Sequence, residues 1–317
     1  MSRTGPESDP TEGEDDGERQ EPTDQVHEWD DALGDGGRDA RPMEAADPAA
    51  RQVVTVDRVP DLPTEGRLFE GRRKVRMADV DPDRRARLDA LARYLADVAE
   101  DDAADAALPP TIGWVLRSTR MAIERFPTLG EELGLRTFCS AVGSRWAERT
   151  TLVEGSRGAE CRAVSVWVAV DTRTGAPARL GDRFFAVYGP SAGGRRATAR
   201  LALGAPTKTA ACAGRPWPLR RSDLDAWAHV NNAVAWAAVE DSVDIAPGDS
   251  VVALVEHHRP IDPATSPVLA VERSGDAWCV WLLHSRRPES VLVASVLDIS
   301  TGRASDPADP GSRHPIG

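Results

Sequence analysis

The spacing of apolar residues along the chain separates two tails from a patterned interior. Up to about residue 64 the apolar positions follow no period, and Gly, Pro, Asp and Glu dominate. Such a segment cannot bury enough apolar surface to offset its chain entropy, so residues 1–64 are expected to form a disordered acidic tail. Residues 304–317 return to Pro, Gly, Ser and Asp, which predicts a second disordered tail.

Helical and extended patterns follow one another from residue 65 onward. Leu88, Leu91 and Leu95 recur at helical spacing, which predicts one long amphipathic helix over residues 83–105. One strand is expected before this helix, at 68–76, and four short strands after it, at 112–123, 133–141, 145–154 and 159–170. A strand, a long helix and antiparallel strands in this order predict an α+β fold with one helix lying on a sheet.

The second half of the chain repeats this order more weakly. A strand is expected at 217–221, a helix at 232–242, and further strands at 250–258, 268–273, 277–285 and 290–299. The repetition indicates an internal duplication. We therefore expect one domain at residues 65–188, a linker rich in Gly, Pro and Ala at residues 189–214, and a second domain at residues 215–303.

Charge is concentrated in the N-terminal tail. Residues 1–50 contain 16 acidic residues and 4 arginines, which accounts for the whole net charge of −12. Because the remaining charges balance, no nucleic-acid partner is expected. The N-terminus lacks the basic and then apolar order of a signal peptide, and no segment approaches ~18 consecutive apolar residues. These features predict a soluble, cytoplasmic protein without membrane insertion.

The four cysteines are far apart and form no C-x-x-C pair, so buried, reduced thiols are expected at Cys139, Cys161, Cys212 and Cys279. No cluster of His, Cys and Asp has the spacing of metal ligands. Neither a metal nor an organic cofactor is therefore expected.

Residues with chemical potential gather in the loop of residues 220–232. A carboxylate at Asp225 could hold the His229 ring in one tautomer while the other ring nitrogen takes a proton from water. Asn231 or Asn232 would cap the next helix, leaving backbone N–H groups able to polarise a carbonyl. Taken singly, each residue is as typical of a turn or a helix cap. Their occurrence in one loop favours a catalytic site.

The string from Asp223 to Asn232 resembles the D-x-D-x-x-x-H-V-N-N signature of acyl-ACP thioesterases. Further elements that resemble the family are I-G-W-V-L-R-S-T-R-M at 112–121, R-F-P-T-L-G at 125–130 and S-V-W-V at 165–168. The resemblance covers most of residues 66–300. It implies two hotdog domains in tandem, each an antiparallel sheet wrapped around a central helix. The first domain would hold the acyl chain and the second would supply the catalytic groups.

Carried over by position, the resemblance implies catalytic roles for Asp225, His229, Asn231 and Asn232. The residues expected to contact the substrate are Trp114, Met121, Trp227, Ala235 and Ala238. Ala235 and Ala238 stand where the family has a Tyr and a Trp, so the acyl tunnel is expected to reach this helix.

Other positions depart from the family pattern. Trp227 replaces an Asn, and Pro260 and Ile261 replace an acid and a cysteine. Groups nearby that could act as acid or base are Asp241, Glu256, His257 and His258. Since neighbours on a strand face opposite sides, at most one of the two histidines should reach the site.

The function implied is hydrolysis of acyl-ACP to a free acid and the carrier thiol, with His229 as general base, by a monomer or homodimer. An acidic carrier protein would meet basic residues at 72–74 or 220–221. Three alternatives remain. They are a thioesterase for acyl-CoA or a polyketide-type carrier, a hotdog hydratase or dehydratase, and an acyl-binding protein without catalysis.

Overall fold

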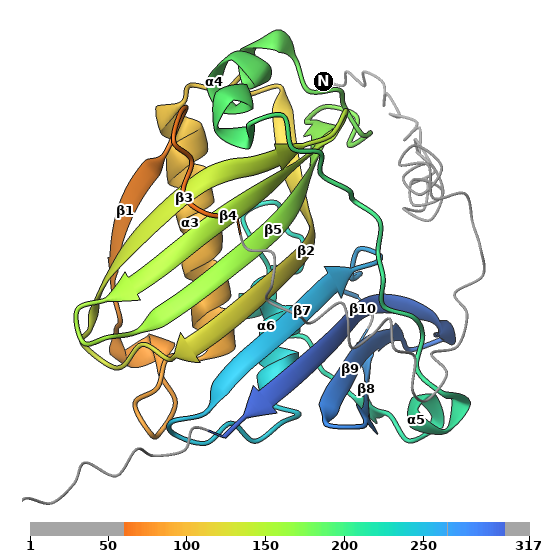
Figure 1. Ribbon diagram of the computed structural model, residues 1–317. Coiled ribbons are helices and arrows are strands. Elements are labelled where there is room, and N and C mark those ends of the chain that lie inside the picture. Colours follow the sequence, from red (N-terminus) through yellow and green to blue (C-terminus); the bar gives the residue numbers. More distant parts are fainter. Residues whose placement is uncertain (1–59, 265, 302–317) are drawn as a thin grey trace, which may run out of the picture.

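One antiparallel sheet of ten strands runs through both halves of the chain in the computed structural model, which describes residues 60–264 and 266–301 (Figure 1). The strand order is β1-β3-β4-β5-β2-β7-β10-β9-β8-β6. The strands are β1 Phe69–Lys74, β2 Ile112–Arg125, β3 Glu132–Val142, β4 Trp146–Gly155, β5 Glu160–Asp171, β6 Arg215–Pro216, β7 Ser250–His257, β8 Val268–Ser274, β9 Ala277–His284 and β10 Arg287–Ser300. The pairing of β2 with β7 joins the two halves.

Two central helices lie against one face of this sheet, hereafter the inner face (Figure 1). They are α3, Leu88–Asp105, in the first half and α6, Ala233–Glu240, in the second. The helices contact each other as well as the sheet. Each half is therefore an antiparallel sheet with one helix packed on it, and the predicted α+β class is confirmed.

Alternation along the strands sorts side chains onto the two faces. Leu91 and Val98 of α3 pack with Met121 of β2 in the main core, between the helices and the sheet. The outer face of the second half carries a separate cluster that includes Leu254 and Trp281. This cluster is covered by the segment that connects the halves, through Leu203.

The structure differs from the predicted elements in four places. The helix expected from residue 83 begins at Leu88, because residues 79–87 close into a loop first. No strand forms at residues 217–221, where the chain instead enters a 3₁₀ turn at Arg221–Asp223. Two short helices were not predicted, α4 at Asp182–Ala192 and α5 at Lys208–Cys212. Cys212 is exposed, unlike the other three cysteines. The predicted tails lie almost wholly outside the described residues.

Glu240, the last residue of α6, ties the two halves together. One carboxylate oxygen lies 2.6 Å from the Arg85 guanidinium, and the other accepts the Leu88 N–H at 2.5 Å. The second contact supplies the N-terminal cap of α3 that the side chain of Arg87 does not provide. Arg85 is 7% exposed and also pairs with Asp81 at 2.8 Å.

The helix α6 is apolar on nearly all sides. Ala235 and Ala238 are 2% and 1% exposed, and Trp236 is completely buried. All three belong to the main core. Core side chains therefore surround Ala235 and Ala238, and their contact with an acyl chain remains a prediction.

Glu256 and His257, the last two residues of β7, lie on opposite faces of the sheet. Glu256 lies on the outer face and accepts the backbone N–H groups of Ala202 and Leu203 at 2.9 and 2.8 Å. His257 shares the inner face with Val255. Burial, with the nearby His258 imidazole, lowers the pKa of His257 from 6.5 to about 4.

We predict that Glu240→Ala lowers the free energy of unfolding by at least about 2 kcal/mol, because it removes a helix cap and one partner of a buried guanidinium. Urea unfolding of the purified chain would measure this. Asp241→Ala is the matched control, since Asp241 forms an exposed ion pair with Arg215 and should contribute less than about 1 kcal/mol. Equal losses in the two variants would contradict the linking role of Glu240.

Ala235→Tyr should destabilise the protein by about 1–3 kcal/mol, since a phenol ring would have to enter a filled core. Thermal and urea unfolding report this directly. Serine at the same position adds far less volume and serves as the control. An unchanged free energy of unfolding in Ala235→Tyr would show that there is room for a phenol ring beside α6.

His257, which is half-buried with its Nε2 shielded from solvent, should make stability depend on pH. Between pH 6.5 and about 4 the unfolded chain binds a proton that the folded chain resists, so the free energy of unfolding falls as pH falls. Between pH 7 and pH 5, the free energy of unfolding should fall by about 1–2 kcal/mol more in the wild type than in His257→Phe. Parallel pH profiles for the wild type and the variant would contradict the prediction.

Candidate active site at the loop before α6

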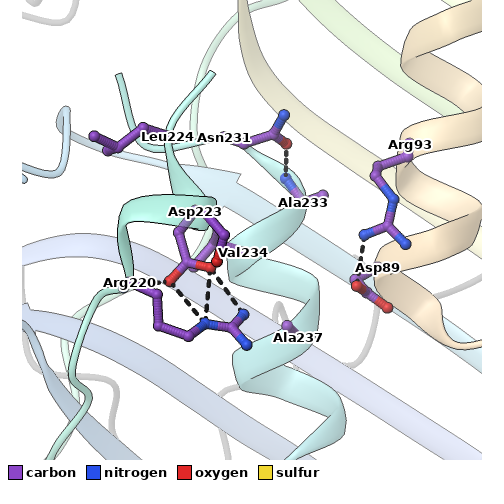
Figure 2. Close-up of a pocket in the computed structure, with 10 residues that line it drawn as sticks. Asp89, Arg93, Arg220, Asp223, Leu224, Asn231, Ala233, Val234 and Ala237 are labelled. Atoms are coloured by element: carbon purple, nitrogen blue, oxygen red, sulfur yellow. Dashed lines mark hydrogen bonds and ion pairs between the residues drawn. The ribbon is translucent and has the colours of Figure 1, made fainter. Parts of the chain in front are cut away.

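The loop from Arg220 to Asn232 is held in shape by its two aspartates. Asp223 is 5% exposed and accepts the Arg220 backbone N–H at 2.7 Å, while its other oxygen lies 2.8 Å from the Arg220 guanidinium (Figure 2). Its backbone oxygen accepts the N–H of Asn231 at 2.8 Å. The first Asp of the motif thus closes the base of the loop, directly before α6.

Asp225 organises the tip of the same loop. One carboxylate oxygen accepts the backbone N–H groups of Trp227 and His229, at 2.9 and 3.0 Å. A bond from the Asp225 N–H to the His229 oxygen, at 2.8 Å, closes the turn. The His229 side chain is exposed. The expected bond from the Asp225 carboxylate to the imidazole is not among the contacts of the described residues, so that role stays a prediction.

The same loop occurs a second time, at residues 76–87 before α3. Asp81 takes the place of Asp225, and Arg85 takes the place of His229: the Asp81 N–H donates to the Arg85 oxygen at 2.9 Å, and the Arg85 N–H donates to Oδ1 of Asp81 at 2.9 Å. Arg84 and Ala228 occupy equivalent positions and both have positive φ, 67° and 60°. The internal duplication expected from the sequence therefore extends to this loop.

The first loop shows where a side chain at the His229 position can reach. The Arg85 guanidinium lies 2.8 Å from Oδ2 of Asp81, the oxygen that the loop backbone does not use. The equivalent oxygen of Asp225 lies at the corresponding place in the second loop. The His229 side chain can therefore point toward Oδ2 of Asp225 in the same direction, although it is shorter than the arginine side chain.

The N-terminus of α6 offers two amide donors. The Ala233 N–H is taken by Oδ1 of Asn231 at 2.8 Å, which makes Asn231 the side chain that caps the helix. Asn232 occupies the cap position by backbone geometry, and its N–H has no acceptor among the described residues. The Asn232 N–H and the Nδ2 amide of Asn231 are thus the donors that a carbonyl oxygen could meet.

A pocket of about 140 Å³ lies between this loop and α3 (Figure 2). Its lining residues from the loop and α6 are Arg220, Ser222, Asp223, Leu224, Asn231, Ala233, Val234 and Ala237. The first half contributes Asp89 and Arg93, an ion pair of 2.6 Å. Arg93 holds the pKa of Asp89 below its usual range, against the effect of burial. Arg220 balances the negative charge of Asp223. The pocket is therefore polar with little net charge.

The other residues expected to contact the substrate lie apart from this pocket. Trp227 is 71% exposed at the loop tip. Met121 is completely buried in the main core, and Trp114 packs against Phe184 of α4 with ring centres 5.5 Å apart. Contacts of these three residues with a substrate remain predictions.

The four possible acid or base groups also separate. Asp241 pairs with Arg215 at 2.9 Å on the surface. Glu256 and His258, whose Nε2 lies 3.5 Å from the Glu256 carboxylate, occupy the outer face, away from α6. An acid or base role for any of the four groups remains a prediction. His257 stays on the inner face.

Sequence reasoning missed the groups that support the loop. Asp223, Arg220, Asp89 and Arg93 shape the pocket, and Arg85 anchors the twin loop. Aligning M-A-D-V-D at 77–81 with R-S-D-L-D at 221–225 would have indicated two equivalent loops, and hence a structural duty for Asp223.

Within residues 60–264 and 266–301, no three His, Cys, Asp or Glu side chains are grouped as a metal ion requires. None of the helices in the same ranges is long and apolar enough to cross a membrane.

Comparison with known proteins places this site in context. A relative, the uncharacterized protein Rv2001 of Mycobacterium tuberculosis, is 27% identical over 244 residues, which is 75% of this chain and 94% of the relative. The fold is similar to that of a 12:0-ACP thioesterase from Umbellularia californica, with a TM-score of 0.60 at 20% identity over 74% of this chain and 97% of the other. An acyl-ACP thioesterase from Bacteroides thetaiotaomicron gives a TM-score of 0.58 at 15% identity, over 74% and 98% of the two chains.

These structures confirm the predicted arrangement of two tandem hotdog domains. Residues 66–188 match the family model described as the acyl-ACP thioesterase N-terminal domain. This match covers the first half of the described fold, from just before β1 to α4.

Proposed function

We propose that this protein hydrolyses acyl thioesters carried on acyl carrier protein, releasing a free acid and the carrier thiol. The observation that carries the proposal is the loop of Asp225 and His229, set at the N-terminus of α6 beside a polar pocket. It stands in a chain whose residues 66–188 match the acyl-ACP thioesterase N-terminal domain. The similarity to a 12:0-ACP thioesterase and a bacterial acyl-ACP thioesterase supports the choice of carrier.

The neutral His229 imidazole takes a proton from a water molecule as the water oxygen attacks the thioester carbonyl carbon. The carbonyl oxygen becomes an oxyanion, which the Asn232 N–H and the Asn231 amide stabilise. When the oxyanion collapses, the carbon–sulfur bond breaks, and His229 returns its proton to the leaving thiolate. Asp225 holds the loop backbone through Oδ1, and its free Oδ2 steadies the imidazolium.

The pocket beside Asn231 is too small for a whole acyl chain. A volume of about 140 Å³ is well below the roughly 300–1,000 Å³ of sites that enclose a whole small ligand. Asp225, His229 and Asn232 are not among its lining residues, so the reacting carbonyl and the acyl chain extend beyond it. Of the basic residues expected to face an acidic carrier, Arg72 and Arg221 are exposed, whereas Arg73 and Arg220 pair with carboxylates of this chain.

His229→Ala should lower kcat/KM for acyl-ACP hydrolysis by at least ~10²-fold, the usual effect of losing a general base. Asp225→Asn should act similarly without unfolding the loop, because an amide oxygen can still accept the Trp227 and His229 N–H groups. Thiol release from purified acyl-ACP measures both effects. His284→Ala is the control, since His284 lies at the far end of β9 and contacts its own turn. Unchanged turnover in His229→Ala would refute the mechanism.

The same assay separates the alternatives. Faster thiol release from acyl-CoA than from acyl-ACP would identify the protein as an acyl-CoA thioesterase. A new double bond or hydroxyl in the product, without thiol release, would indicate a hydratase or dehydratase. Binding of acyl-ACP with no reaction at all would indicate an acyl-binding protein.

A further inference from the structure

Two buried ring nitrogens on the inner face of the sheet have no hydrogen-bond partner among the described residues. They are Nε1 of Trp167 on β5 and Nε2 of His257 at the end of β7. Buried polar atoms in native proteins are nearly always paired, with protein, water or a ligand. Two unpaired nitrogens on one face therefore point to a polar group that binds there.

The strand register places these two residues on either side of the same stretch of β2. Trp167 pairs with Leu116 on β2, and the next pair along β2 joins Ser118 to Glu256, the neighbour of His257. Both residues thus flank the β-bulge between Leu116 and Ser118. With adjacent strands about 4.8 Å apart, their Cα atoms are separated by roughly 10 Å across β2.

Alternation along each strand places both rings on the helix side. Trp167 lies on the same face of β5 as Cys161 and Ala163, which belong to the main core. His257 lies on the same face of β7 as the core residue Val255. The outward residues Val166 and Val168 pack elsewhere, under Ala199. The loop that precedes α6 belongs to the same side of the sheet as the two rings.

The next row of the sheet is polar too. Thr119 and Ser165 lie between the two rings and the apolar core, and their hydroxyls hydrogen-bond each other at 3.0 Å. These hydroxyls are 3% and 7% exposed by residue, so the pair is closed off. Trp167 and His257 are both half-buried, although helices cover this face. The two nitrogens themselves are shielded from solvent, so a polar group bound to them would be enclosed.

We propose that this seam, defined as Trp167, His257 and the Thr119–Ser165 pair, binds a hydroxyl group on the acyl chain, so that the substrate is a hydroxyacyl thioester. The proposal rests on the proposed function and names its substrate class. An indole N–H can only donate a hydrogen bond, whereas the neutral imidazole nitrogen donates or accepts according to tautomer. A hydroxyl serves both, because it accepts from Trp167 and either donates to or accepts from His257. A hydrocarbon chain would leave both nitrogens unpaired.

Binding of non-hydrolysable thioethers tests the proposal without requiring turnover. The probes are decanoyl-ACP analogues with the thioester sulfur–carbonyl replaced by a thioether, either unsubstituted or with one hydroxyl at successive chain carbons. Calorimetry on the full chain should show that one hydroxyl position binds roughly tenfold more tightly than the unsubstituted chain. Trp167→Phe and His257→Phe each remove one nitrogen and keep an aromatic ring, so each should reduce that preference several-fold while leaving the affinity for the unsubstituted chain unchanged.

Trp146→Phe is the matched control, because Trp146 lies on the outer face and bonds to the Ala197 oxygen at 3.0 Å. It should leave the hydroxyl preference intact. No preferred hydroxyl position, or a preference that survives both seam variants, would mean that ordered water alone occupies the seam and would overturn the proposal. If unsubstituted acyl chains are hydrolysed and no hydroxyl preference is found, hydroxyl binding at the seam is refuted but the proposed hydrolysis is not. A hydroxyl preference in a protein that never releases thiol upholds the seam as a binding site and refutes the hydrolysis.

Discussion

The contact of Glu240 with Arg85 and Leu88 fixes how the two halves of this protein meet. A single carboxylate on the last residue of α6 caps the start of α3 and, with Asp81, pairs with a buried guanidinium. Burial raises the pKa of Glu240, and Arg85 opposes that effect by favouring the charged form. Since α6 carries the candidate catalytic loop at its other end, the position of that loop depends on an ion pair with the first domain. The candidate site thus depends on the contact between the two halves of the chain.

The twin loops show how one backbone can serve two purposes. Both are closed by an aspartate that accepts the N–H four residues later, and both contain a non-glycine residue with positive φ. In the first loop that later residue is Arg85, buried and paired with two carboxylates. In the second it is His229, exposed to solvent. Identical main-chain geometry therefore stabilises the domain junction in one copy and presents a titratable ring in the other.

The patterns that could be predicted from the sequence are those set by local chemistry. The helical spacing of Leu88, Leu91 and Leu95 indicated α3, and the apolar pattern over residues 250–258 indicated β7. The start of α3 could not be predicted, because its cap comes from Glu240, 152 residues away. Likewise, nothing local indicates that Ala235 and Ala238 are enclosed by core residues from both halves. The motif identified the loop, whereas its neighbours Asp89 and Arg93 come from a distant helix.

The distribution of polar groups on the inner face also bears on where an acyl chain can lie. Around α6 the core is closed by Ala235, Trp236 and Ala238, and the pocket at the loop is too small for a whole acyl chain. Next to the β2–β7 junction, by contrast, half-buried rings of Trp167 and His257 interrupt the core. Both ring nitrogens are shielded from solvent, and the neighbouring Thr119–Ser165 pair is closed off. A chain that reaches this junction must therefore be enclosed between the helices and the sheet.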